Sequence, residues 1–289
     1  MRKHSFLFRN IALVALLLMS LMTSCRKEEY VDLTFDSKLE QPSMDPDAAK
    51  AYLSQEEYVY WESTDMIRVF PGNGGPSKDC NLDPLADPRR ASFSAYAILS
   101  SDSYYAIYPQ SFASTNFNTL IIPTSHVYRD DFSFGGTSWP MVAWCKDAEG
   151  IPYMDFHAVC GMARIQLTAT ASATINSITF TEVGDQHAGY STHPISGAFT
   201  IQNATKNAPH IVPSNPGAPG SEITIAEINQ PVGPSNLLTF YLPLPATTAY
   251  NAPTTTTSYA ISMTVHSSEG EFTKDFAVKI RRNNITPVR

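Results

Sequence analysis

The sequence is poor in charged residues, and it lacks a cluster of basic side chains. Charged residues make up 16% of the 289 positions, with 20 Lys and Arg against 27 Asp and Glu. Globular proteins usually carry about a quarter, so Ser, Thr, Asn and Gln must supply much of the polar surface. Nucleic-acid binding needs clustered Lys and Arg. The net charge of -7 therefore predicts that the chain does not bind nucleic acid.

Cysteines are few, and their spacing matches no metal-binding or redox motif. Besides Cys25 there are Cys80, Cys145 and Cys160, an odd number that cannot all pair within one molecule. One disulfide is compatible with an oxidising compartment, but nothing singles out a pair. We expect buried free thiols at these three positions.

Catalytic motifs are also missing. The sequence contains no GxSxG elbow, phosphate-binding loop, Gly-rich dinucleotide fingerprint or metalloenzyme His spacing. We therefore expect no enzymatic activity, no cofactor and no metal. Paired carboxylates for sugar hydrolysis need not lie close in sequence, so a secreted hydrolase remains an alternative interpretation.

What the chain does have begins at its amino terminus. Basic residues lie within positions 2–9, and positions 11–22 are almost wholly apolar. A helix needs about 20 apolar residues to span a bilayer, so this run is too short. Its length and its basic flank instead predict a secretory signal peptide.

The small residues Thr23 and Ser24 precede Cys25, and this arrangement resembles the lipobox of bacterial lipoproteins. The resemblance implies a signal peptide at residues 1–24, cleavage between Ser24 and Cys25, and lipidation of Cys25 with palmitate among the acyl chains. Two or three acyl chains hold a protein on a membrane almost permanently. The alternative is an ordinary secretory peptide with an incidental Cys.

Elsewhere the apolar residues mostly alternate, which predicts β-strands. Val31, Leu33 and Phe35 give one such strand. The parity of the apolar residues changes beside Gly161, as a β-bulge would produce. Short strands between Pro and Gly turns predict antiparallel sandwiches. Single sandwiches hold about 100–150 residues, so we expect two domains, residues 25–148 and 149–289.

Five further sets of residues occur in a characteristic order after the lipobox: residues 61–69, residues 104–109, residues 154–165, Ile178 and Phe180 with Gly197 before Phe199, and residues 280–283. Together they resemble the fimbrillin-like lipoproteins, the pilus subunits of Gram-negative anaerobes. The resemblance implies an all-β fold of two tandem transthyretin-like β-sandwich domains. It also implies a pilus subunit, or an accessory or tip adhesin, at the surface of the cell outer membrane and in the fimbrium.

In that family a protease removes the first strand, and the vacated groove accepts a strand from the next subunit. Other pilus subunits are therefore the implied partners. The resemblance makes Val31, Leu33 and Phe35 the displaceable strand, with Lys38 and Lys50 as processing sites. The alternative is a permanent edge strand. No Arg lies in residues 37–63, which departs from the pattern of the major subunits.

Aromatic residues gather near a Gly-Gly turn, among them Trp139 and Trp144. Exposed rings there would stack on a glycan or contact a host protein. This leaves a second functional class open, a glycan-binding outer-membrane lipoprotein of a nutrient-uptake system. Core packing is the other interpretation of these side chains.

Overall fold

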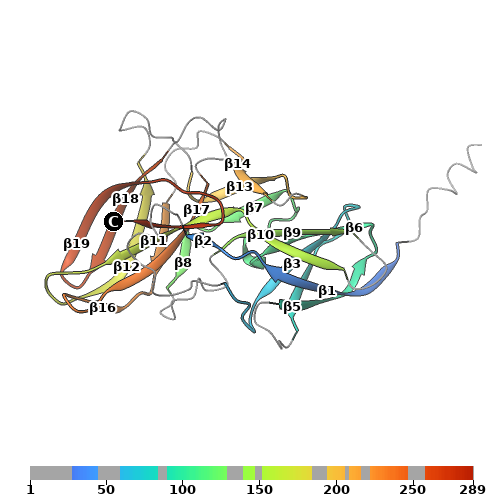
Figure 1. Cartoon of the computed structure of the whole chain (residues 1–289), viewed down its shortest axis with the longest axis horizontal. Helices are drawn as coiled ribbons and strands as arrows, with labels where there is room; N and C mark the ends of the chain where they lie inside the picture. Colours follow the sequence, from blue (N-terminus) through green and yellow to red (C-terminus); the bar gives the residue numbers. More distant parts are fainter. Residues whose placement is uncertain are drawn as a thin grey trace, which may run out of the picture.

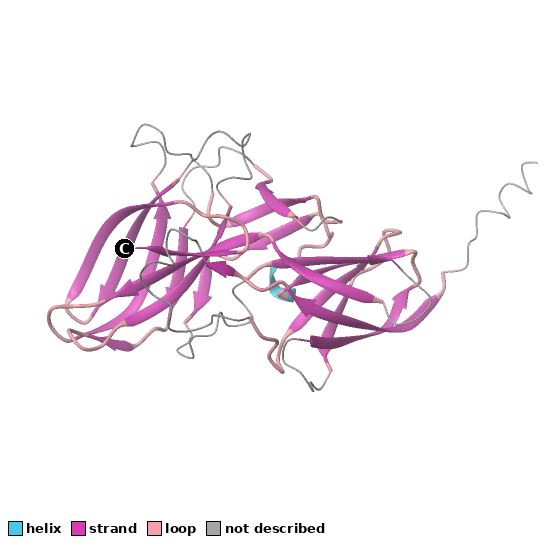
Figure 2. Cartoon of the chain, in the orientation of Figure 1, coloured by secondary structure: helices cyan, strands magenta, loops and turns pink. Residues whose placement is uncertain are grey.

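The protein is all-β, as the alternating pattern predicts. Its structure is a computed structural model that describes residues 28–44, 59–83, 90–128, 139–146, 152–183, 194–205, 208–215, 222–246 and 258–288. Within these ranges the only helix is a single 3₁₀ turn, η1 (Gln110–Phe112), and the ordered elements are otherwise strands (Figure 2). None of the described elements is a helix long and apolar enough to cross a membrane.

The first half of the chain forms a closed seven-stranded barrel at one end of an elongated molecule (Figure 1). Going around the barrel, the strands are β1 (Tyr30–Leu39), β10 (Tyr153–Ala158), β9 (Met141–Lys146), β6 (Ser103–Tyr108), β3 (Met66–Pro71), β4 (Lys78–Leu82) and β5 (Arg90–Leu99). Every pairing in the barrel is antiparallel except that of β1 with β10. Closure removes the free edges that an open sheet would present.

Apolar side chains at alternate positions fill the barrel, because every second side chain along a strand points inward. Ile67 and Val69 on β3, Phe93 on β5 and Phe156 on β10 are fully buried in one apolar cluster. Trp61, which precedes β3, joins the same cluster. The core of this half therefore lies on the barrel axis.

The second half of the chain forms most of three smaller sheets, which extend from beside the barrel to the other end of the molecule (Figure 1). One is a four-stranded sheet in the order β17 (Leu238–Pro245), β11 (Cys160–Leu167), β20 (Asn284–Val288) and β2 (Ser43–Met44). A six-stranded sheet has the order β19 (Gly270–Val278), β18 (Tyr259–Ser267), β12 (Ala173–Glu182), β15 (Glu222–Ala226) and β8 (Ser125–Val127), with β16 (Gln230–Val232) also on β12. A three-stranded sheet has the order β14 (His210–Pro213), β13 (Gly197–Gln202) and β7 (Thr119–Ile122).

Three strands of the first half pair with strands of the second. β2 lies parallel to β20, β7 antiparallel to β13, and β8 parallel to β15. The chain thus crosses between the two ends of the molecule more than once. The structure shows a barrel with several sheets, and the finer prediction of two transthyretin-like sandwiches, divided after residue 148, stays a prediction.

The joint between the two ends lies at Val159, where β10 of the barrel stops and β11 of the four-stranded sheet begins. The parity change beside Gly161 therefore accompanies a crossing from one sheet to another. Gly161 is needed for packing at this joint, because a Cβ atom there would overlap the carbonyl oxygen of Arg281 and the side chain of Ile280. The segment before β20 consequently runs directly against the joint.

Candidate functional site: the seat of the first strand

β1 closes the barrel by pairing on both of its sides. Along one side it runs antiparallel to β5, from Tyr30 opposite Leu99 to Lys38 opposite Arg90, with a register shift between Val31 and Leu33. Along the other side residues Asp36 to Leu39 run parallel to β10. Removing β1 would therefore leave two strands of the barrel with unpaired main-chain groups.

The inward face of β1 is anchored by Phe35, which has no exposed surface. Its ring meets Tyr104 edge to face, with the ring centroids 5.4 Å apart. Leu39 is buried in the same cluster, while Val31 and Leu33 pack against it partly buried. The predicted face of Val31, Leu33 and Phe35 is thus the inward one, and it continues through Leu39.

Sequence reasoning missed the extension to Leu39 because a polar residue, Ser37, interrupts the apolar series. Ser37 is buried, and its hydroxyl donates a hydrogen bond to the carbonyl oxygen of Ala91 at 3.1 Å. A buried hydroxyl that is hydrogen-bonded is compatible with the core. The extension could have been recognised from the odd-numbered positions of residues 31 to 39, which all lie on one face of the strand. A small polar residue on that face does not end the pattern.

Glu40, directly after β1, is the centre of a polar cluster at the joint. Its carboxylate accepts two hydrogen bonds from the Arg282 guanidinium, at 2.7 and 3.1 Å, and one from the backbone N–H of Ala158 at 3.0 Å. His157 Nδ1 lies 3.6 Å from the same carboxylate. Partial burial raises the pKa of Glu40, but the neighbouring His157 and Arg282 outweigh that effect, so its pKa lies below the usual value.

The residues after Glu40 are also held by the end of the chain. The Asn283 side-chain amide donates to the carbonyl oxygen of Gln41 at 2.8 Å. The Gln41 side chain in turn exchanges hydrogen bonds with the backbone of Val59, at 3.2 and 3.0 Å. β2 then pairs with the start of β20. Residues 28–44 therefore occupy one continuous position, called the seat, which lies between β5 and β10 in the barrel and beside β20 in the four-stranded sheet.

Of the predicted processing and lipidation residues, only one lies within the described part of this seat. Lys38 lies inside β1, with its amino group 3.2 Å from Asp155 in a pair that is about half exposed on both sides. Such exposed pairs contribute little stability. A cut after Lys38 would fall within the paired strand. Lys50, Ser24 and Cys25 lie outside the described residues.

The predicted ligand-facing aromatics are not both at the surface. Trp139 is 1% exposed and belongs to the barrel core, so it cannot present its ring to a glycan or a host protein. This corrects the prediction for Trp139, which has a packing role. Trp144 is partly buried on β9 opposite Tyr105 of β6.

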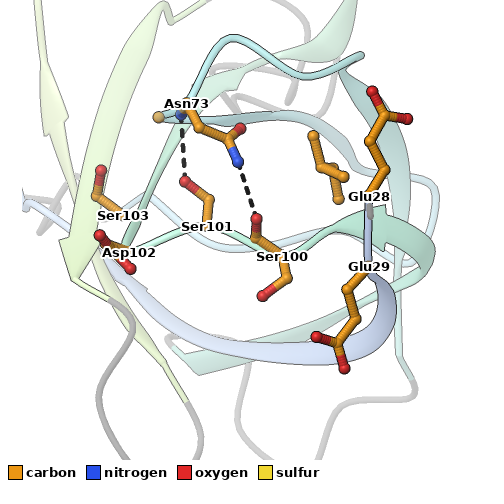
Figure 3. Close-up of a pocket in the computed structure, with 9 residues that line it drawn as sticks. Glu28, Glu29, Asn73, Ser100, Ser101, Asp102 and Ser103 are labelled. Atoms are coloured by element: carbon orange, nitrogen blue, oxygen red, sulfur yellow. Dashed lines mark hydrogen bonds between the residues drawn. The ribbon is translucent and has the colours of Figure 1, made fainter. Parts of the chain in front are cut away.

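A separate polar cavity of about 500 Å³ lies beside the start of β1 (Figure 3). Its lining includes the acidic residues Glu28, Glu29 and Asp102, with serines of the β5–β6 turn. Asn73 shapes the wall with two donated hydrogen bonds, from its side-chain amide to Ser100 O at 2.9 Å and from its backbone N–H to Ser101 Oγ at 3.2 Å. Within the described residues, no group of three or more His, Cys, Asp or Glu is placed to hold a metal ion.

Cys80, Cys145 and Cys160 are all buried, and none of these three forms a disulfide. Burial raises the pKa of Cys80 to about 12, and it also raises the pKa of Cys160. Because the thiolate is the reactive form, we expect iodoacetamide at pH 8 to leave these three thiols unmodified in the folded protein. Mass spectrometry after unfolding in urea should show all three alkylated. Rapid labelling of any of these three thiols in the folded protein would contradict its burial.

No protein-family model matches the sequence, and no curated protein is similar to it in sequence. Solved structures are similar in fold. The chain resembles fimbrial and cell adhesion proteins. One, from Bacteroides ovatus and provisionally named a cell adhesion protein, shares 13% identity and a TM-score of 0.49 over 90% of this chain and 91% of its own.

A second structure with the same provisional name, from Bacteroides fragilis, shares 10% identity and a TM-score of 0.46 over 88% of this chain and 91% of its own. A fimbrial assembly protein from Parabacteroides distasonis shares 10% identity and a TM-score of 0.38 over 90% of this chain and 91% of its own. The similarity is too distant to assign a function, which has to be argued from the seat of β1.

Proposed function

We propose that the chain is a lipid-anchored pilus subunit, or an accessory or tip adhesin, that assembles at the bacterial outer membrane by donor-strand exchange. The observation that carries the proposal is the position of β1. This strand closes a barrel near the start of the described chain, it is paired on both sides, and Phe35 fills the core from it. A strand so placed serves as a stand-in for a strand of another subunit.

The energetics of the seat support replacement of β1 by an equivalent strand. Departure of β1 exposes a row of main-chain donors and acceptors on β5 and β10, together with the site of the Phe35 ring. An incoming strand restores both, because main-chain hydrogen bonds give affinity and alternate side chains fill the pockets. The vacated barrel is therefore expected to bind another extended segment tightly.

The proposal also gives a role to the predicted lipid on Cys25. A lipid there would hold the precursor on the membrane until the chain is cut between β1 and the rest of the barrel. Lys50 lies between Met44 and Val59, after the whole seat-filling segment, so a cut there would free residues 28–44 as one piece. The two-domain arrangement of the family is part of the same proposal.

The test is to place a specific protease site between Met44 and Val59, cut the protein and remove the amino-terminal fragment. We expect the trimmed protein to form a ladder of oligomers on a non-denaturing gel, while the uncut protein carrying the same inserted site stays monomeric. Adding an excess of a peptide spanning residues 28–44 should suppress the ladder, because the peptide refills the seat. If trimmed and uncut protein both remain monomeric, self-assembly by donor-strand exchange is wrong for this chain.

A further inference from the structure

The seat of β1 ends in a set of hydrogen-bond donors that all point at one carboxylate. Arg282 and the Ala158 N–H together give three hydrogen bonds to Glu40. The side chains of Glu40 and Arg282 are 22% and 23% exposed, so water screens the pair only in part. Bidentate Arg–carboxylate pairs add geometric specificity as well as strength.

These donors belong to the part of the chain that stays when the amino-terminal segment leaves. Arg282 is held independently of Glu40, because its guanidinium also donates to the carbonyl oxygen of Ala158 at 2.9 Å. The next residue, Asn283, is fixed at the joint by a hydrogen bond from its backbone N–H to Cys160 O at 2.9 Å. The vacated seat thus keeps a positioned positive charge beside an N–H donor.

A replacement strand without a carboxylate at this point would leave Arg282 without a counter-charge and the Ala158 N–H without an acceptor, in a half-buried place. Leaving a buried donor unpaired costs more than a made hydrogen bond gains, and the cost is larger for a charged group. A basic side chain there would add repulsion. Only a carboxylate satisfies all three donors together.

We propose that Arg282 and the Ala158 N–H form a carboxylate-selective clamp, so that the strand accepted from a second subunit must carry an acidic side chain where Glu40 lies. The inference rests on the proposed function and adds a sequence requirement to it. The occupant repeats the pattern of Phe35, Leu39 and Glu40, which is two apolar side chains four residues apart followed at once by Asp or Glu.

The clamp also sets the register of the incoming strand. Apolar side chains at every second position tolerate a slip of two residues, because the same face still points inward. Such a slip moves the carboxylate by roughly 6.5 Å along the seat. That displacement takes it out of reach of Arg282, so the clamp penalises slipped pairings that the apolar pockets alone would accept.

The clamp can be tested on the full chain carrying the protease site between Met44 and Val59. After cutting, the amino-terminal fragment is removed in urea, and the body is refolded with two isotope-distinguished peptides spanning residues 28–44 at equal concentration. One peptide is unchanged and the other carries Glu40→Gln. We expect the body to capture the unchanged peptide in about 30-fold excess, measured by mass spectrometry, because the charged hydrogen bonds are lost in the variant.

Two controls separate the clamp from a general charge effect. A competition between the unchanged peptide and one carrying Glu29→Gln, an exposed position, should give nearly equal capture. In a body carrying Arg282→Gln, the preference for Glu40 over Gln should fall at least about tenfold. If that body does not refold, the two peptide competitions on the unchanged body decide the matter.

The outcomes distinguish this inference from the proposed function. Equal capture of the unchanged and Glu40→Gln peptides overturns the clamp and leaves strand exchange intact. Failure to capture any peptide contradicts strand exchange, and the clamp fails with it. A preference for Glu40 that persists undiminished in the Arg282→Gln body also overturns the role of Arg282.

Discussion

Replacing Phe35 with Ala is expected to lower the free energy of unfolding by about 3–5 kcal/mol, the usual cost of truncating a buried Phe. Phe35 has no exposed surface, and its ring meets Tyr104 edge to face within the barrel core. The substitution removes this packing and leaves a cavity under the seam between β5 and β10. The loss would be read from the urea midpoint followed by intrinsic fluorescence.

Phe272→Ala is a matched control for Phe35→Ala. Phe272 lies on β19, an edge strand of the six-stranded sheet, and 58% of its surface is exposed. The same chemical change there should cost less than about 1 kcal/mol, because surface substitutions away from packing features have small effects. Equal losses in the two variants would contradict the anchoring role of Phe35.

The strands themselves were predictable from local pattern. Alternation along residues 31–35 placed Phe35 on a buried face, and turns rich in Pro and Gly separated the other strands. These features depend on side chains two positions apart, so the sequence displays them directly. Buried thiols outside any disulfide were also expected at Cys80, Cys145 and Cys160, and the structure has them.

Features built from distant segments were not predictable in this way. Glu40 and Arg282 are 242 residues apart in sequence, and no local pattern links a Glu after one strand to an Arg before another. Closure of the barrel depends on the parallel pairing of β1 with β10, which joins residues 36–39 to residues 153–156. The placement of β7 and β8 in sheets of the second half depends on similar long-range pairing.

Two local patterns in the sequence were each compatible with two different structures. The parity change at Gly161 is what a bulge within one strand would give, and a strand that crosses between two sheets at Val159 gives it as well. The aromatic residues near Trp139 suit a ligand surface or, more often, a core, since large rings serve both. The structure decides between a ligand surface and a core, because it buries Trp139. The strands around Trp139 are far away in sequence, so the local pattern could not show this burial.

Trp61→Ala is expected to cost a similar amount to Phe35→Ala, about 3–5 kcal/mol, for a separate reason. Trp61 is 3% exposed, and its ring meets three others edge to face, Phe93 at 5.0 Å, Tyr108 at 4.9 Å and Phe156 at 5.4 Å between centroids. Phe93 lies on β5 and Phe156 on β10, the two strands that flank β1. Trp61 thus bridges the walls of the seat from inside the barrel.

From this bridging position Trp61 helps to hold the two walls together when β1 is absent. It follows the segment proposed to leave, so a trimmed subunit retains it. Trp61→Ala should therefore lower the urea midpoint of the intact protein and also reduce recapture of a peptide spanning residues 28–44 by the trimmed body. Tyr60→Ala, at the adjacent position with 41% exposure, is the control and should leave both measurements nearly unchanged. Recapture that survives Trp61→Ala undiminished would show that the walls of the seat hold their spacing without this ring.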